Sequence, residues 1–185
     1  MGTPPPAAGL GTTPEPPCRD QAMAHTLTNA EVQDRLWKAI DDDHTGMLGL
    51  THDNHHFQPM TAFVERETNT LWFFTRTDTD LAQSVAGGAD AAFIFVDRKL
   101  QACVDGRLTF SHDRERIDRY WNAHVAAWYP DGKDDPALTL LRLDVTEAAV
   151  WITEGGLLEY AFEVAKANAS KTTPDVGERR DLNFH

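Results

Sequence analysis

Hydrophobic positions near the start of the chain follow a helical period. Val32, Leu36 and Ile40 recur at every fourth position, which places them on one face of a helix. Thr28 precedes them as a suitable N-cap, and Glu31 stands three residues later, as a capping box requires. The pattern therefore predicts a helix that begins near Thr28.

Beyond this helix the hydrophobic pattern changes to that of strands. Six apolar or alternating runs between turn signals are predicted to be strands: Met47–Leu50, Met60–Glu65, Thr70–Thr75, Ala91–Val96, Gln101–Thr109 and Leu138–Ile152. The short connections Glu67–Asn69 and Asp97–Lys99 predict two hairpins.

Three helices are predicted among or after these strands, over Asp80–Ala86, Arg114–Trp128 and about Leu157–Ala169. The first is followed by Gly87-Gly88, which is typical of a helix C-terminus. Successive hairpins with few crossover helices favour an antiparallel sheet or barrel over a parallel doubly wound sheet. A mainly β fold with peripheral helices is therefore expected.

The two ends of the chain differ in composition from the part that holds the predicted strands and helices. Residues 1–22 hold six of the ten prolines and bury too little apolar surface to offset their ordering entropy, so we expect a disordered tail. A Pro-rich docking motif is disfavoured there, because no clean PxxP register with a basic flank is present. We expect one domain over residues 23–170 and a flexible segment over 171–185.

Charge and cysteine content narrow the classes of partner. The chain has 185 residues, with 17 Lys and Arg against 29 Asp and Glu, for a net charge of −12. This balance argues against nucleic acid and anionic membrane surfaces, and no apolar run approaches the ~20 residues of a membrane span. Two cysteines, Cys18 and Cys103, cannot form a disulfide scaffold and indicate free thiols in a reducing cytoplasm.

Several short motifs occur in a recognisable order. They are Gln58-Pro59-Met60, Leu71–Thr75, Asp105-Gly106, Tyr120-Trp121, Ala127–Pro136 and Ala149–Trp151. With them the sequence resembles the general stress protein branch of the pyridoxamine 5′-phosphate oxidase-like superfamily, over about residues 28–170. The resemblance implies an FMN-binding split β-barrel, a homodimer and a flavin at the dimer interface, with FAD as a second candidate cofactor.

The resemblance also implies which residues contact the flavin. The candidate cofactor-binding residues are Gln58, Met60, Phe74, Thr75, Arg76, Thr79, Leu81, Gln101, Trp121 and Trp128. Gln101 is implied to come from a partner strand. Gln58, Asp80 and Leu81 stand where the family carries the cations that hold the flavin phosphate. Because a phosphate dianion needs such cations, weakened FMN binding is expected, with Arg76 first and Arg107 second as replacements.

Two main hypotheses of function follow. The first is a flavin-binding stress-type protein, in which bound flavin supplies any oxidoreductase chemistry and no side-chain general base is required. The alternative is a non-catalytic binding or regulatory barrel that has lost FMN or takes a ligand without a phosphate. Haem binding through a histidine is a third, minor hypothesis.

For the other residues that could carry chemistry, a structural role is preferred over a catalytic or ligand-binding one. Trp121 and Trp128 stand seven residues apart, so on one helix they share a face, which fits packing better than ligand binding. The histidines near His52 and His56 are expected in a polar loop rather than a metal site. Cys103 is expected to be a small buried residue. The Asp134-Asp135-Pro136 segment is expected to turn the chain rather than supply acid–base catalysis.

Overall fold

The structure is a computed structural model, and it describes residues 27–52, 56–85, 87–153, 165–166 and 177–184. The predicted tail over residues 1–22 lies outside this part of the chain. The predicted helix over 157–169 also lies outside it, except for Ala165 and Lys166, which are helical. The domain limits at 23 and 170 therefore stay predictions.

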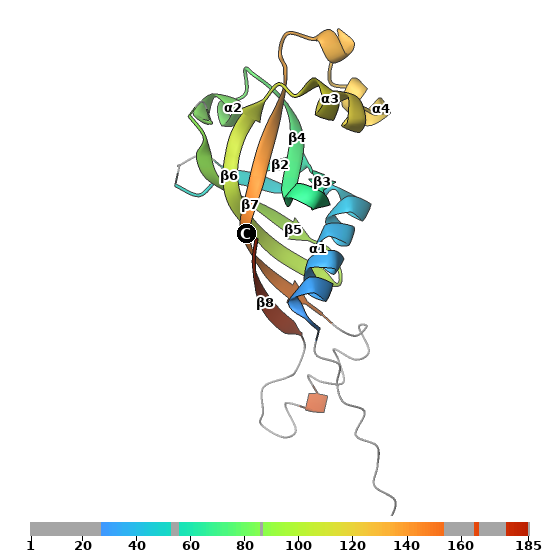
Figure 1. Cartoon of the computed structure of the whole chain (residues 1–185), viewed down its shortest axis with the longest axis vertical. Coiled ribbons are helices and arrows are strands. Elements are labelled where there is room, and N and C mark those ends of the chain that lie inside the picture. Colours follow the sequence, from blue (N-terminus) through green and yellow to red (C-terminus); the bar gives the residue numbers. More distant parts are fainter. Residues whose placement is uncertain (1–26, 53–55, 86, 154–164, 167–176, 185) are drawn as a thin grey trace, which may run out of the picture.

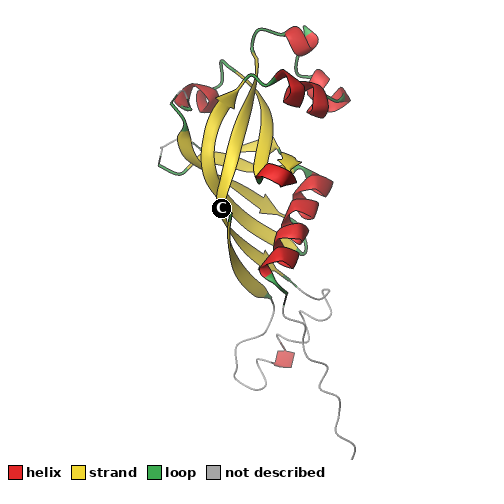
Figure 2. Cartoon of the chain, in the orientation of Figure 1, coloured by secondary structure: helices red, strands yellow, loops and turns green. Residues whose placement is uncertain are grey.

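Strands dominate the described residues (Figure 2). In chain order the elements are α1 (Asn29–Asp43), β1 (Thr45–Leu50), β2 (Gln58–Thr61), β3 (Phe63–Glu65), β4 (Thr70–Arg76), α2 (Asp80–Ser84), β5 (Ala89–Val96), β6 (Leu100–Ser111), α3 (Arg114–Tyr120), α4 (Ala123–Ala126), β7 (Leu138–Ile152) and β8 (Glu178–Asn183). Short 3-10 turns cover Arg66–Thr68 and Gly132–Asp134. No described helix is long and apolar enough to cross a membrane.

The strands form one curled antiparallel sheet in the order β2-β1-β5-β6-β7-β4-β3, and β8 pairs with the far half of β7 (Figure 1). The predicted strand Met60–Glu65 is in fact two strands. β2 pairs with β1 and β3 pairs with β4, and between them Ala62 N–H donates to the His44 carbonyl at 2.7 Å. This one segment therefore joins the two ends of the sheet and gives the fold its barrel form. The expectation of a split β-barrel with peripheral helices is confirmed.

The helix α1 closes the inner side of the barrel. The predicted capping box is present: the Glu31 carboxylate accepts from Thr28 N–H at 2.8 Å, and Thr28 Oγ1 accepts from Glu31 N–H. The buried face of α1 holds Val32, Leu36, Trp37 and Ile40. These side chains pack with the inward-facing residues of the strands, so the main hydrophobic core lies between α1 and the sheet.

A second, smaller core lies on the outer side of the sheet. Trp72 and Leu140 alternate with the inward-facing Leu71 and Leu141, so they point outward, where Ile117 of α3 packs over them. The helices α3 and α4 thus cover the outer side only at the upper end of β4 and β7, as Figure 1 shows.

The predicted helix Arg114–Trp128 is wrong in its length. α3 ends at Tyr120, and its C-cap Trp121 has an extended backbone. Asn122 then starts α4 by accepting hydrogen bonds from His124 N–H and Val125 N–H. The asparagine side chain competes for the backbone donors that a continuous helix would use. Trp121 and Trp128 therefore do not share a helical face.

Within the segment 171–185, for which flexibility is predicted, the described residues 177–184 belong to the sheet and the core. β8 pairs with β7 from Glu147↔Asn183 to Ile152↔Glu178, and Leu182 and Phe184 are buried in the main core. The Phe184 ring lies 5.3 Å from the ring of Trp37 on α1. The sequence does not predict that β8 packs on the core, because its charged residues alternate with the few side chains that face inward.

Candidate functional site

The end of β4 and the start of α2 hold four of the predicted cofactor-binding residues: Phe74, Thr75, Arg76 and Thr79. We refer to residues 74–80 as the β4–α2 corner. The hydroxyls of Thr75 and Thr79 lie 3.3 Å apart, and Thr79 Oγ1 donates to the Arg76 carbonyl at 3.0 Å. Thr79 also caps α2 by accepting from Ala82 N–H. The local sequence thus fixes two hydroxyls and a guanidinium at one corner of the barrel.

The charge at this corner is mostly negative. Arg76 donates to both carboxylate oxygens of Asp78, at 3.1 and 3.2 Å, and lies 3.9 Å from the buried Asp135. The hydrogen bond from Arg76 lowers the pKa of Asp78, so this aspartate stays charged at neutral pH. Asp80 is exposed beside them. A bound phosphate would therefore have to compete with carboxylates for the cation nearest to the predicted site.

Leu81 is part of the hydrophobic core. Its side chain is only 3% exposed and packs in the main core with Val85. The structure gives Leu81 a packing role, and its predicted contact with the cofactor stays a prediction. The helix α2 is only five residues long and uses Leu81 and Ala82 to cover the upper end of the core, which requires apolar side chains at these positions.

Aromatic rings cover the outer side of the corner. The Phe74 ring centroid lies 5.6 Å from that of Phe63 and 6.0 Å from that of Trp121, and Trp121 lies 6.0 Å from Tyr129. Burial raises the pKa of Tyr129 to about 12, so its phenol stays neutral. Trp128, in contrast, is 78% exposed. The structure brings Trp121 to Phe74 and leaves Trp128 at the surface.

The remaining predicted residues lie elsewhere in the chain. Gln58 and Met60 are on the edge strand β2, opposite Leu48 and Gly46, and Met60 packs against the main core. Gln101 donates to the Asp97 carbonyl at 2.9 Å, at the far end of β6.

Gln101 is distant from the β4–α2 corner. Thr75 pairs with Thr139, and the adjacent Leu140 pairs with Ser111, ten residues along β6 from Gln101. At about 3.3 Å per residue, the separation is about 30 Å. One chain alone cannot place Gln101 and Thr75 on the same ligand.

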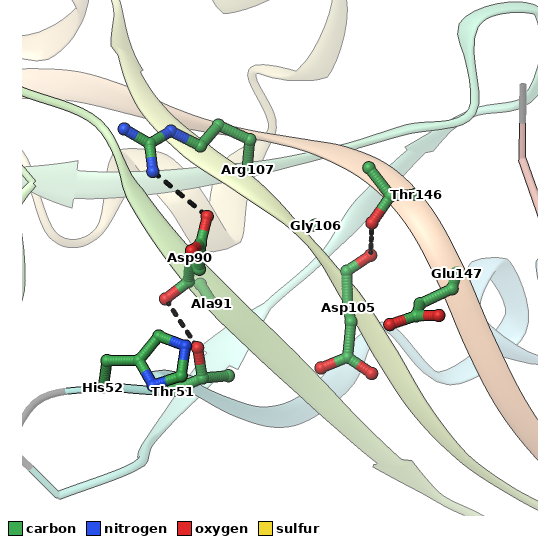
Figure 3. A pocket seen from close by; sticks show the side chains of 9 residues that line it. All are labelled: Thr51, His52, Asp90, Ala91, Asp105, Gly106, Arg107, Thr146 and Glu147. Atoms are coloured by element: carbon green, nitrogen blue, oxygen red, sulfur yellow. Dashed lines mark hydrogen bonds and ion pairs between the residues drawn. The ribbon is translucent and has the colours of Figure 1, made fainter.

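A polar pocket of about 410 Å³ lies on the outer side of β5, β6 and β7 (Figure 3). Its residues are Thr51, His52, Asp90, Ala91, Asp105, Gly106, Arg107, Thr146 and Glu147. Arg107 is held by Asp90 at 3.0 Å and by the Gly88 carbonyl at 2.8 Å. Arg107 therefore also binds neighbours within the chain. Its cross-strand partner Asp144 is six residues along β7 from Leu138, the partner of Arg76.

The carboxylates of the pocket do not form a metal site. Asp105 and Glu147 are direct cross-strand partners, and their carboxylates lie on the same side in Figure 3. Among the described residues no group of three or more His, Cys, Asp or Glu side chains could hold a metal ion. His55 of the predicted polar loop lies outside these residues.

Cys103 is half-buried on the outer side of β6, whereas its neighbour Val104 faces the core. The prediction that Cys103 is buried is therefore met only in part, because strand alternation turns Val104 and not Cys103 to the core. Burial, and then the Asp105 carboxylate 3.7 Å away, raise the pKa of the Cys103 thiol, which disfavours a nucleophilic role.

The Asp134-Asp135-Pro136 segment has the structural role expected of it. Asp135 accepts from Ala137 N–H at 2.9 Å, and Asp134 pairs with Arg114 at 2.7 Å. Both carboxylates thus fix the turn before β7.

The sequence analysis missed an outer apolar patch. Its exposed members are Met47, Ile94, Val96 and Trp151. Met47 pairs with Ile94, while Val96 and Trp151 each pair with Gln101 on the strand between them. The signal was present: Ala91–Val96 is apolar at every position, although only every second residue can face the core. Both faces of β5 are therefore apolar although the outer one is exposed, which points to a partner on the outer side.

Comparisons with known proteins agree with this architecture. A family model described as pyridoxamine 5′-phosphate oxidase like matches residues 31–175. A search of curated proteins found no match.

Solved structures give the same result. A general stress protein 26 from Jannaschia sp. CCS1 is 34% identical, with a TM-score of 0.71 over 85% of this chain and 100% of that chain. A general stress FMN/FAD binding protein from Xanthomonas citri is 40% identical, with a TM-score of 0.64 over 69% of this chain and 93% of that chain. A protein from Clostridium acetobutylicum, described as related to general stress protein 26 and the pyridoxinephosphate oxidase family, shares the fold at 19% identity and a TM-score of 0.57, over 68% of this chain and 91% of that chain.

Proposed function

Because this chain belongs to the pyridoxamine 5′-phosphate oxidase-like family, we propose that it binds a flavin, FMN or FAD, as a homodimer. The observation that carries the proposal is its 40% identity to the Xanthomonas citri protein described as binding FMN or FAD. The β4–α2 corner supports it, since Thr75 and Thr79 bring two hydroxyls together there, and Phe74 and Trp121 offer apolar ring surface on the outer face of the same strand end.

The residues at the corner fit a flavin ring better than they fit its phosphate. Aromatic and hydroxyl groups suit a flat heterocycle with polar edges. The phosphate would meet Arg76 together with Asp78, Asp80 and Asp135, and each of the latter three repels an anion. We therefore propose that the ring supplies most of the affinity and that the phosphate adds little.

A second copy of the chain completes this site in our proposal. Gln101 lies about 30 Å from Thr75 along the strands of one chain, so both can contact one ligand only if they come from different copies. The outer apolar patch supports association, because Val96 is 64% exposed and Trp151 is 41% exposed. Burial of such side chains against a second copy would remove them from water.

A bound flavin would supply hydride or electron transfer, and the chain would supply orientation. In this proposal Phe74 and Trp121 exclude water from the ring, and Thr75 and Thr79 contact its polar groups. The raised pKa of Tyr129 keeps that phenol protonated, so it would not act as a base near neutral pH. We propose a flavin-dependent oxidoreductase in a reducing cytoplasm on these grounds.

The visible absorption spectrum of the purified full chain, followed by titration with FMN, FAD and riboflavin, tests the proposal. We expect binding of all three, with FMN and riboflavin within about tenfold of each other, or about 1.4 kcal/mol. Asp78→Asn releases Arg76 and should tighten FMN but not riboflavin. Asp42→Asn, an exposed change on α1, is the matched control.

The outcomes separate the two main hypotheses. If none of the flavins binds at about 1 mM, where binding is worth only about 4 kcal/mol, the chain is a cofactor-free binding module. If FMN binds far more tightly than riboflavin to the wild type, the carboxylates near Arg76 do not weaken binding of the phosphate. Leu81→Lys is not a useful variant, because it would bury a charge in the core.

A further inference from the structure

The chain between β6 and β7 forms one segment that packs on the outer side of the sheet. We refer to residues 112–137 as the α3–α4 segment, and Figure 1 shows its helices beside the upper end of β4. Two ion pairs tie α3 to the 3-10 turn that precedes β7: Arg114 binds Asp134 at 2.7 Å, and Lys133 binds Asp118 at 2.6 Å. The segment is therefore held together internally, and its contacts with the sheet determine where it lies.

The helix α3 is too short to keep its place without tertiary contacts. It has seven residues, and isolated helices of this length are not stable in water. Ile117 is its buried residue and packs over the sheet. Such apolar contact is non-directional, so it does not fix the rotation of the helix about its own axis. A directional contact is needed for that.

Glu65 at the end of β3 supplies this directional contact with its two carboxylate oxygens. Oε1 accepts from Arg116 at 3.0 Å and from Arg119 at 3.2 Å, both on α3. Oε2 accepts from Trp72 Nε1 on β4 and from Thr68 Oγ1 in the β3–β4 connection, each at 3.1 Å. One oxygen thus binds the helix and the other binds the sheet. Because hydrogen bonds between charged groups are strong and directional, Glu65 fixes the orientation of α3.

Trp121 is the residue whose place depends on this contact. It is the C-cap of α3, and its N–H is hydrogen-bonded to the last turn of that helix. Its ring centroid lies 6.0 Å from those of Phe74 and Tyr129. Arg119 stands two residues before Trp121, so Glu65 binds the end of the helix from which the indole projects. A shift of α3 would therefore move the indole at the β4–α2 corner.

The strand β3 connects the same carboxylate to the aromatic rings of the corner. Phe63 stands two residues before Glu65, so both side chains face the outer side of the sheet. The Phe63 ring centroid lies 5.6 Å from that of Phe74 and 5.2 Å from that of Tyr120 on α3. One three-residue strand thus contacts both the helix and the corner, and it sets their relative position.

We propose that Glu65 is a positioning residue of the flavin site, which holds Trp121 where its indole covers the flavin ring. The inference rests on the proposed function and adds a residue that does not contact the ligand. Glu65 is only 4% exposed, and its two oxygens accept four hydrogen bonds from protein side chains. It therefore acts on the ligand through Trp121.

Riboflavin binding to the full chain tests the proposal and leaves the phosphate out of the comparison. We expect Glu65→Gln to weaken riboflavin binding about tenfold, because a supporting contact sets the place of a residue that touches the ligand. Phe184→Ala, between β8 and α1, is the control for lost stability and should change the affinity by less than about twofold. The visible circular dichroism of riboflavin at saturation reports the surroundings of its ring. It should lose intensity in Glu65→Gln and not in Phe184→Ala.

A double-mutant cycle tests whether Glu65 acts through Trp121. Trp121→Ala should itself weaken riboflavin binding, and in that background Glu65→Gln should change the affinity by less than about twofold. An equal effect of Glu65→Gln with and without the indole overturns the proposal. Arg119→Gln removes one of the two α3 donors from a half-exposed position and should weaken binding even if Glu65→Gln does not fold. Lys38→Gln, an exposed change on α1, is its control.

Hydrogen exchange of the flavin-free chain separates this proposal from the proposed function. Glu65→Gln should speed amide exchange in α3 about tenfold relative to Phe184→Ala, because local opening no longer breaks charged contacts. If exchange rises there but riboflavin binds both variants equally, Glu65 stabilises α3 without serving the site, and flavin binding stands. If the wild type binds no riboflavin, the proposed function is overturned together with the role of Glu65 in it, whatever the exchange of α3 shows.

Discussion

The Nε1 of Trp72 on β4 donates a 3.1 Å hydrogen bond to the carboxylate of Glu65 on β3, a side chain that is only 4% exposed. The same carboxylate accepts from Thr68 Oγ1 at 3.1 Å, from Arg116 at 3.0 Å and from Arg119 at 3.2 Å. Both arginines belong to α3. One buried carboxylate thus attaches α3 to the sheet.

Glu65→Gln should reduce the free energy of unfolding by about 3 kcal/mol. The amide keeps the shape of the side chain, but it cannot pair two guanidinium groups and leaves donors without a charged acceptor. Urea unfolding followed by circular dichroism measures the change. Glu67→Gln, an exposed change two residues away, is the control, and equal stability of the two variants would contradict this role of Glu65.

The ionisation of Glu65 should make the stability of the protein depend on pH. Burial raises the pKa of this carboxyl, but hydrogen bonds from Trp72 and Thr68 and the charge of Arg116 outweigh it and hold the pKa below 4.5. A carboxyl group whose pKa is lower in the folded than in the unfolded state contributes its full stabilisation of the fold at pH values above its unfolded pKa. That contribution is lost as the pH falls through the folded pKa. The difference in unfolding free energy between wild type and Glu65→Gln should therefore be constant from pH 7 to about 5 and shrink below pH 4.5.

Gly106→Ala should destabilise the chain by about 3 kcal/mol or more. β6 has an irregular register between Asp105 and Gly106, and a Cβ at Gly106 would lie 2.2 Å from the Asp144 carbonyl oxygen on β7. Backbone atoms at this distance must move apart, which breaks the ladder. Gly87→Ala is the control, because a Cβ there has no heavy atom within 4 Å. Thermal unfolding of both variants compares them, and equal midpoints would show that the bulge accommodates a side chain.

Phe184→Ala should cost about 3 kcal/mol, although the residue is next to last in the chain. Its ring packs on Trp37 and its N–H donates to the Thr146 carbonyl at 2.9 Å. Truncation leaves a cavity between β8 and α1. The exposed Asn183→Ala is the control, and chemical denaturation measures both. A change below about 0.5 kcal/mol would mean that the C-terminal strand adds nothing to the core.

Local elements of this protein could be predicted where one short-range pattern is sufficient. The capping box at Thr28 and Glu31 depends on residues three positions apart, and the six strand runs depend on alternation within a few residues. The turn at Asn69 needs only a left-handed residue between two strands. Such features are determined by backbone hydrogen bonds and side-chain period, which the sequence displays directly.

The departures from prediction depend on contacts between distant segments and, at Asn122, on a local side-chain cap. Nothing near Arg180 shows that its strand pairs with Val150, or that Leu182 and Phe184 reach the core. The exposure of Trp128 follows from the break at Asn122, where a side-chain cap competes with a continuous helix.

The sequence by itself determined the family and the runs of residues that form the sheet. The tertiary structure decided which of these residues meet. It placed Leu81 in the core, tied Arg76 to Asp78 and set Gln101 at the opposite end of the strands from Thr75. The physical reason is that the strand period fixes only which face a residue occupies, whereas strand register and chain closure fix its neighbours.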